Sequence, residues 1–467
     1  MSKVLAFDFG ASSGRAILAE YKNGELTYKE VHRFDNNPVE SNGHLCWDFD
    51  SLMTNVRVGI AKAGNFDSIG FDTWGVDFGL LDEKGELISQ PIHYRDSRTD
   101  GVVEKALTKM NAETLYAKTG NQIMGINTLF QLLASDLTKA KKLLFMPDLF
   151  AYMLCKKAVC EQSIASTSQM LDPRTKKWNS EVLKTFNLDE SLFADPVPSG
   201  TVIGEFDGAK IIAVAGHDTQ CAVAALPTRE KNVAFLSCGT WSLFGTELDE
   251  PILTNQSREA NLSNELGANG KVTYLKNIIG LWLIQESRRA WRRNGQEYSY
   301  ADLEKQALAS PPLVSFIDPD APEFTPTGDI PTRVCEFCKR TNQKVPETVG
   351  EIMRCIYESL ALKYRFALEQ LTEVTGKNFD VLHILGGGTK DKLLCQMTAN
   401  SCNIPVVAGP IEATALGNII IQLKALGEIK DIDAGRKLIQ NTETLLHYTP
   451  CDEFLWNQAY NKYKTIL

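Results

Sequence analysis

Two segments of this 467-residue sequence begin alike, and this repetition constrains the fold more than any other feature. Residues 4–10 and 233–239 are both runs of strand-forming side chains that end at a glycine-bearing polar turn, after which a second strand begins. A chain of this length exceeds what one core normally holds. The repeat therefore predicts two related lobes, each headed by a hairpin.

A short charged stretch with a proline, residues 227–232, separates the two halves and has the composition of a linker. We expect a first lobe over 1–226 and a second over 227–467. Strand-like runs alternate with helical periodicity along both halves, which predicts an α/β fold. In the second half, apolar residues at four-residue intervals over 352–368 predict a buried helix that ends at Gly376.

Charge and cysteine usage restrict the classes of partner. The net charge is −9 and both signs are mixed along the chain, so we expect no nucleic-acid partner. No apolar run has the length of a membrane helix, and no obligate protein partner is indicated. Eleven cysteines without framework spacing suggest reduced thiols, which predicts a cytoplasmic protein.

The turn at residues 10–15 combines small residues, two hydroxyls and a cation directly after a strand. Such a turn can wrap phosphate oxygens because little side-chain bulk blocks its amides. A plain tight hairpin would look the same. Asp8, inside the preceding apolar run, needs a partner or a metal when buried, and Mg²⁺ would fit. Alternatively, Asp8 caps its own turn.

Two further segments combine polar side chains with strand ends. Residues 71–78 mix aromatic side chains with Asp72 and Asp77, as in sugar sites, although a strand edge packed by its own aromatics explains them equally well. The buried-type strand 211–215 ends before His217 and Asp218. Asp218 is a candidate general base for a sugar hydroxyl, or else part of a structural His–Asp hydrogen bond.

Seven segments share an order and spacing that extend over nearly the whole chain: residues 8–15, 72–78, 94–99, 217–219, 239–243, 277–282 and 386–388. In these segments the chain resembles the FGGY-type carbohydrate kinases, which share the actin and heat-shock chaperone fold. The resemblance implies two ribonuclease-H-like lobes of the actin-like ATPase fold, with ATP, Mg²⁺ and a sugar in the cleft between them. The first lobe would bind the sugar and the second the nucleotide.

The resemblance also assigns residues. Asp218 would take the proton from O1 of the ketose, while Asp8 stays the metal candidate because of its place in the apolar run. ATP would be held by Ala11, Ser12, Ser13, Gly14, Arg15, Thr240, Gln285 and Gly387. The ketose would contact Gly75, His217, Asp218, Thr219 and Asn277. Cys238 stands where the family carries a serine.

The substrate that the resemblance implies is L-rhamnulose, phosphorylated at O1 in rhamnose catabolism. L-Fuculose and L-xylulose differ from it in one hydroxyl's configuration or in chain length, and kinases of these ketoses are the nearest alternatives. A non-kinase ATPase on the same fold is a third. The partners expected are therefore a small sugar and ATP.

Overall fold

The computed structural model of the chain describes residues 1–228 and 230–467 and divides into two compact units. Unit 1 comprises Met1–Arg229, Glu247–Leu275 and Ala413–Glu443, and unit 2 comprises Glu230–Thr246, Lys276–Glu412 and Thr444–Leu467. The chain thus passes between the units several times. The predicted linker over 227–232 includes Arg229, which lies outside the described residues, and the assignment of sugar and nucleotide to separate lobes stays a prediction.

Unit 1 is built on a six-stranded mixed sheet of order β13-β14-β6-β1-β2-β3. β1 pairs antiparallel with β2 and parallel with β6, and β6 pairs parallel with β14. The hairpin predicted from the first repeat is therefore confirmed. The strands are β1 Ser2–Phe9, β2 Ser13–Lys22, β3 Glu25–Asp35, β6 Ser68–Thr73, β13 Thr201–Phe206 and β14 Ala209–Ala213.

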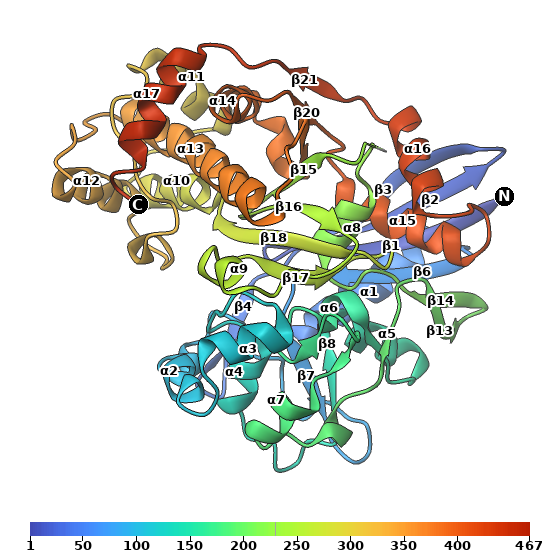
Figure 1. The fold of residues 1–467 in the computed structure, drawn as a ribbon. Coiled ribbons are helices and arrows are strands. Elements are labelled where there is room, and N and C mark those ends of the chain that lie inside the picture. The colour runs from blue at the N-terminus through green and yellow to red at the C-terminus, as the bar shows by residue number, and fades with distance from the viewer. Residues whose placement is uncertain (229) are drawn as a thin grey trace. The chain divides into compact units, whose positions relative to one another are not determined.

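The central strand β1 is buried on both faces, which explains its nearly continuous apolar sequence. Leu5, Phe7 and Phe9 pack in one cluster with helices α1 (Phe49–Ala63) and α5 (Met146–Cys155). Because side chains alternate along a strand, Asp8 points to the opposite face. Helix α15 (Ala413–Ala425) contacts β1 and β6, so a segment near the chain's end lies beside its first strand, as Figure 1 shows.

Unit 2 repeats this topology. Strand β15 (Val233–Cys238) pairs antiparallel with β16 (Trp241–Leu248) and parallel with β19 (Val381–Leu385). β19 in turn pairs parallel with β20 (Val406–Ala408), which pairs antiparallel with β21 (Leu446–Tyr448). The neighbours of β15 thus match those of β1, which confirms the second predicted hairpin and explains the repeat as two copies of one sheet plan.

The long helix α13 (Val349–Thr375) confirms the helix predicted from the four-residue periodicity, and Gly376 ends it with a φ of 67°. Other helices of unit 2 are α10 Trp282–Arg293, α11 Tyr300–Ala309, α12 Ile330–Arg340, α14 Lys392–Cys402 and α17 Glu453–Tyr463. Those of unit 1 are α2 Val102–Leu107, α3 Ala112–Thr119, α4 Thr128–Leu133, α6 Gln162–Ala165, α7 Ser180–Thr185, α8 Asp218–Ala224, α9 Asn255–Glu259 and α16 Ile432–Thr442.

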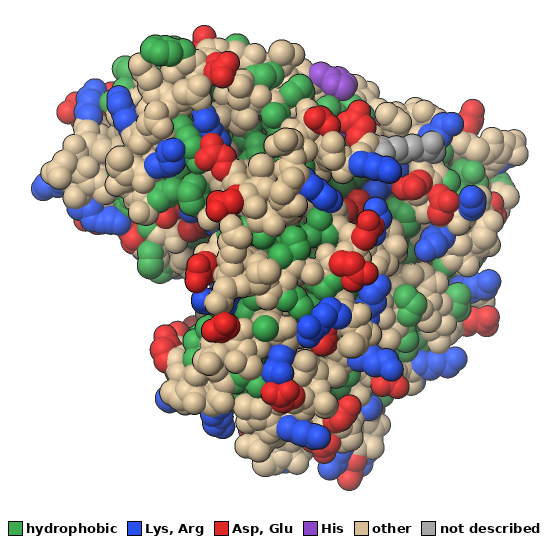
Figure 2. All heavy atoms as spheres, in the orientation of Figure 1, with side chains coloured by type: hydrophobic (Ala, Val, Ile, Leu, Met, Phe, Trp, Pro, Cys, Tyr) green, Lys and Arg blue, Asp and Glu red, His purple; other side chains and the backbone are tan. Residues whose placement is uncertain are grey.

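The remaining strands are short, apart from β18, whose first half pairs with β17 in unit 1. They are β4 Pro38–Ser41, β5 His44–Trp47, β7 Phe78–Leu81, β8 Lys142–Phe145, β9 Cys160–Glu161, β10 Leu171–Asp172, β11 Lys177–Trp178, β12 Pro196–Val197, β17 Ser263–Leu266 and β18 Val272–Ile279. In the part of the chain that the structure describes, no helix has both the length and the apolar character needed to cross a membrane. On the face drawn in Figure 2, acidic and basic side chains are interspersed.

Candidate active site

Neighbouring parallel strands of unit 1 end at one edge of the sheet and bring acidic side chains together. The register of β1 and β6 places Asp8 opposite Asp72. A bridge pairs Thr73 with His217, so the segment that follows β14 continues beside β6. Ligands of open α/β sheets bind at the carboxyl ends of parallel strands. The structure therefore places the predicted residues Asp8 and Asp218 at the same edge of the sheet.

The first predicted phosphate turn joins β1 to β2. The Gly10 amide donates to the Ser13 carbonyl at 2.9 Å, and the Asn36 side chain donates to the Gly10 carbonyl at 2.9 Å. Ser12 is exposed, while Ala11 is half-buried. These bonds fix a short turn whose polar groups reach the surface, and its binding of ATP phosphates stays a prediction.

Two other residues of this segment have clear structural reasons. A Cβ atom on Gly14 would lie 2.3 Å from the ring of Phe34, so a side chain there would have to displace that ring. Arg15 donates to Asp8 Oδ2 from Nε at 3.0 Å and from Nη2 at 2.7 Å. From the sequence, Asp8 was predicted to hold the metal and Arg15 to bind ATP. In the structure these two residues pair with each other, which compensates the charge of the buried Asp8 carboxylate.

From the sequence, Asp72 was considered only as an acceptor in the aromatic segment 71–78, yet it is fully buried between Asp8 and helix α15. Its Oδ2 accepts a hydrogen bond from Asn418 at 2.6 Å, while its Oδ1 is buried without a hydrogen-bond partner. Burial and the negative charge of Asp8 raise the pKa of Asp72 well above its usual range. The signal for it in the sequence was its place at the end of an apolar strand, as for Asp8.

The orphaned oxygen of Asp72 also tests whether the site suits a cation. A buried carboxylate oxygen that accepts no hydrogen bond is stabilised by a proton or a metal ion. Asp8 lies opposite Asp72 in the sheet, and oxygen ligands from carboxylates are those that Mg²⁺ prefers. The residues at this edge therefore fit Mg²⁺.

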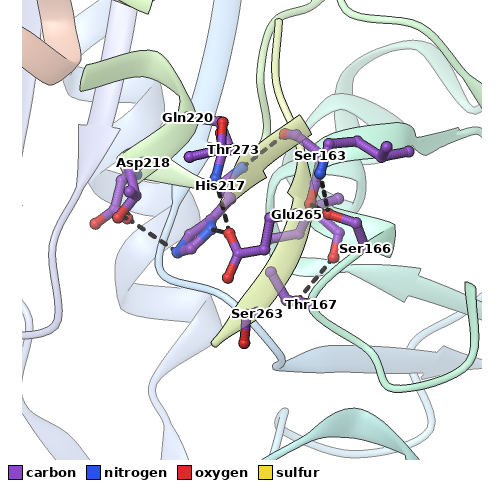
Figure 3. Close-up of polar contacts among 12 residues, drawn as sticks. Ser163, Ser166, Thr167, His217, Asp218, Gln220, Ser263, Glu265 and Thr273 are labelled. Carbon is purple, nitrogen blue, oxygen red and sulfur yellow. Dashed lines mark hydrogen bonds and ion pairs between the residues drawn. The ribbon is translucent and has the colours of Figure 1, made fainter. Parts of the chain in front are cut away.

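His217 and Asp218 follow β14, and Asp218 is the first residue of helix α8. Figure 3 shows His217 between two carboxylates: its Nδ1 lies 2.7 Å from Glu265 Oε2, and its Nε2 lies 3.4 Å from Asp218 Oδ1. The amide of Thr219 donates to Asp218 Oδ1 at 2.6 Å. The Asp218 side chain keeps 30% of its surface exposed, so this carboxylate is fixed in direction and still accessible.

The charges of this pair are set by their surroundings. Burial raises the pKa of Asp218 to about 6, although the positive charge of His217 opposes the shift. Burial alone would lower the pKa of His217, but the Glu265 carboxylate outweighs it and brings the pKa to about 8. Near neutral pH, an ionised Asp218 thus faces a protonated His217, as a general base with a neighbouring hydrogen-bond donor requires.

Gly75 lies beside this pair. A Cβ atom on Gly75 would lie 3.2 Å from Thr167 and 3.5 Å from His217 Nε2, which leaves little room for a side chain. The next residue, Val76, has a φ of 67°, a strained value for a β-branched residue. Its amide donates to Thr167 Oγ1 at 3.0 Å and its carbonyl accepts from Thr128 at 2.7 Å. Strain held by such contacts often marks a functional site.

The aromatic side chains of the same segment pack inside unit 1. Trp74 lies against Trp47, with ring centroids 3.9 Å apart. Asp77 is fully buried and accepts hydrogen bonds from both indoles, at 2.6 Å and 3.0 Å, and from the Gln131 side chain at 2.9 Å. These aromatic side chains therefore pack inside unit 1, which is one of the two interpretations that the sequence left open.

The Asp77 network supports a stability prediction. Asp77→Asn is expected to lower the free energy of unfolding by about 1–3 kcal/mol. The asparagine side chain has only one oxygen, so its NH₂ group would face one of the buried N–H donors that Asp77 now accepts from, and that donor would lose its acceptor. Urea unfolding measures the loss, with Asp195→Asn at an exposed position as the matched control. Equal unfolding free energies for the two variants would show that the network contributes nothing.

In unit 2 the predicted nucleotide residues gather around the second hairpin turn. Thr240 Oγ1 donates to Gln285 Oε1 at 3.3 Å, and the Thr240 carbonyl accepts from the amides of Gly280 and Trp282 at 3.2 Å and 3.1 Å. The turn after β15 is therefore held against the start of helix α10. Asn277, predicted to contact the sugar, lies on the second half of β18 in the same unit.

The glycine turn after β19 belongs to the same group. A Cβ atom on Gly388 would lie 2.2 Å from Cys238 Sγ, whereas one on Gly387 would meet no atom within 4 Å. Cys238 is therefore buried against this turn, while Gly387 borders open space. The structure brings Thr240, Gln285 and Gly387 into one region of unit 2, and their contact with a nucleotide stays a prediction.

Comparison with known families gives two matches that together cover most of the chain. Residues 3–226 match the N-terminal domain of the FGGY family of carbohydrate kinases, and residues 234–426 match its C-terminal domain. Three bacterial proteins named rhamnulokinase are similar over nearly their whole length. That of Bacteroides thetaiotaomicron is 42% identical, over 98% of each chain. That of Enterococcus faecalis is 40% identical, over 98% of this chain and 97% of its own.

The third, from Bacillus subtilis, is 37% identical over 96% of this chain and 95% of its own. Solved structures agree in fold at lower identity. A xylulose kinase from Lactobacillus acidophilus superposes with a TM-score of 0.80 at 17% identity, over 100% of this chain and 98% of its own. Glycerol kinase from Plasmodium falciparum with ADP gives 0.78 at 16% identity, with the same coverage. These likenesses confirm the predicted α/β fold of the actin-like ATPases.

Proposed function

Since this chain belongs to the FGGY family of carbohydrate kinases, we propose that it transfers the γ-phosphoryl group of ATP to O1 of L-rhamnulose. The observation that carries the proposal is Asp218, an accessible carboxylate at the carboxyl end of a parallel strand. It occurs in a chain that is 37–42% identical to proteins named rhamnulokinase. The products would be L-rhamnulose 1-phosphate and ADP.

Asp218 is the group that would accept the proton of the O1 hydroxyl. As the proton leaves, O1 forms a bond to the γ-phosphorus, the bond to the β,γ-bridging oxygen breaks and ADP departs. The Thr219 amide holds one oxygen of Asp218, so the other is available to the substrate. His217 and Gly75 lie beside it and would contact the ketose, with Thr219 and Asn277 as further contacts.

Residues 11–15 of unit 1 would bind phosphates of ATP. Within unit 2, Thr240, Gln285 and Gly387 would contact the nucleotide. Mg²⁺ would be held by Asp8, with Asp72 beside it, and it would supply the positive charge that phosphoryl transfer requires. Asp8 is also paired with Arg15, which places a second positive charge at this edge.

The pH dependence of kcat/KM follows from the two titrating groups. We expect kcat/KM for the ketose to rise as the pH increases through about 6, because Asp218 must lose its proton to act as base. It should fall as the pH increases through about 8, because His217 then loses its proton. Initial rates across this range, with nucleotide and Mg²⁺ saturating, measure both limbs. A flat profile around pH 6 would exclude Asp218 as the titrating base.

The substrate is tested by coupled ADP release with ATP, Mg²⁺ and a panel of L-rhamnulose, L-fuculose, L-xylulose and glycerol. We expect the highest kcat/KM for L-rhamnulose. A clear preference for L-fuculose or L-xylulose would assign the chain to another ketose. ATP consumption that no sugar stimulates would favour the non-kinase alternative. The cytoplasmic location also stays a prediction.

A further inference from the structure

A series of hydrogen-bonded side chains leads from Thr273 on β18 to the candidate base Asp218. Thr273 donates to the Gln220 side chain, and Gln220 Nε2 donates to Glu265 Oε2 at 2.8 Å. The same Glu265 oxygen lies 2.7 Å from Nδ1 of His217, whose Nε2 points toward Asp218 at 3.4 Å. Figure 3 shows these residues side by side, and all of them belong to unit 1.

Glu265 is the member of this series that links Gln220 to His217, and strand β17 fixes its position. It is 4% exposed on β17, whose Leu266 amide donates to Ser166 Oγ at 2.9 Å. The neighbouring Asn264 amide donates to the Gly120 carbonyl at 2.8 Å. A buried carboxylate destabilises a fold unless it is paired, and here the pair is the His217 ring. The hydrogen bonds of β17 thus fix the position of Glu265, and His217 is its ionic partner.

We propose that Glu265 is a positioning residue that holds His217 as an imidazolium, with Nδ1–H donated to Glu265 and Nε2–H kept as a fixed donor beside Asp218. The inference rests on the proposed function in one respect, since it takes Asp218 as the base. A neutral imidazole that donates Nδ1–H to Glu265 has no proton on Nε2 and cannot donate there. The charge of Glu265 thus decides what His217 presents to the site.

Three carboxylates affect the charge of His217: Glu265 from β17, Asp218 from α8 and Glu161 from β9. Burial lowers the pKa of His217, and Glu265 is the largest influence that raises it. The positive charge of His217 in turn lowers the pKa of Asp218. Removal of the Glu265 charge is therefore expected to leave His217 neutral near pH 7 and to raise the pKa of Asp218.

Glu265→Gln tests this with little change of shape. In kinetics, we expect the acidic limb of the kcat/KM profile to move to higher pH and the basic limb to lower pH. Each unit of displacement lowers kcat/KM on that limb by about tenfold. Glu265→Asp keeps the charge and is expected to restore part of the profile. Glu83→Gln removes an exposed charge of the same unit and is expected to leave the profile unchanged.

A second measurement does not depend on turnover. In ¹⁵N-histidine-labelled protein without sugar, both ring nitrogens of His217, assigned with a His217→Gln variant, should carry protons at pH 7. In Glu265→Gln, one nitrogen should lose its proton. Failure of the wild type to use L-rhamnulose would refute the proposed function and leave this result standing.

The inference is overturned if His217 is neutral at pH 7 in the wild type, which can be read even if Glu265→Gln does not fold. It is also overturned if Glu265→Gln loses activity and thermal stability while its pH profile keeps the wild-type limbs, because Glu265 would then be merely structural.

Discussion

Asp218→Asn is expected to lower kcat by about 10²- to 10⁴-fold, because an amide of the same shape cannot accept the proton of the O1 hydroxyl. KM for the ketose should change far less, since the asparagine oxygen still accepts the Thr219 amide and keeps its place beside His217. Single-turnover rates with saturating ATP and sugar measure the chemical step directly.

Stability separates this loss from unfolding. Burial disfavours the ionised form of Asp218, as its pKa of about 6 indicates, so a neutral amide should leave the melting temperature unchanged or raise it at pH 7. Asp195→Asn, at an exposed position, is the matched control. Turnover of Asp218→Asn near the wild-type value would remove Asp218 from the role of base.

Gly417→Ala is expected to destabilise unit 1 by about 1–3 kcal/mol or more, which is typical of overpacked cores. A Cβ atom on Gly417 in helix α15 would lie 1.8 Å from the Cys221 carbonyl oxygen in helix α8. Helix propensity alone predicts the opposite sign, a gain of about 1 kcal/mol for alanine over glycine. Because α8 begins at Asp218, a shift of this helix should lower kcat as well.

Gly59→Ala in helix α1 provides the comparison for this prediction. Its Cβ atom would lie 2.7 Å from the ring of Phe7, a side chain that can move, so a smaller loss of stability is expected. Urea unfolding of both variants measures the difference. A Gly417→Ala variant as stable as wild type would contradict the close packing of α15 on α8.

Local patterns in the sequence were sufficient for the hairpins and for two acidic residues of the edge. The runs before Gly10 and Gly239 are each a buried strand with a short turn, which alternation and turn chemistry describe without tertiary information. Asp8 and Asp218 stood out because each is a charged residue at the end of an apolar run. In the fold, both lie at the carboxyl ends of parallel strands.

The contacts that the sequence did not reveal depend on pairing between distant segments. Asp72 lies opposite Asp8 in the sheet and accepts a hydrogen bond from Asn418, which is 346 positions away from Asp72 in the sequence. Glu265 becomes notable only because β17 carries it to His217. Neither contact leaves a local pattern. The aromatic segment around Trp74 was ambiguous for the same reason, because Trp47 covers its ring from another part of the chain.

The division of the fold into two related units was only partly predictable from the sequence. Matching hairpins predicted the duplication, and the equivalent strand pairings confirm it. That Ala413–Glu443 returns to unit 1 could not be read from the sequence, because helix α15 has an apolar pattern that would suit either sheet. Its partner is decided by side chains such as Asn418 and Gln422, which bond to β1 and β6.

The product of the reaction tests the central claim most directly. Wild-type protein, incubated with ATP, Mg²⁺ and ¹³C-labelled L-rhamnulose, should form one equivalent of ADP for each phosphorylated sugar. The NMR spectrum of that sugar should show phosphorus coupling at C1, while Asp218→Asn under the same conditions should form the product far more slowly. Phosphate at another carbon, or ADP release without a phosphorylated sugar, would contradict the account.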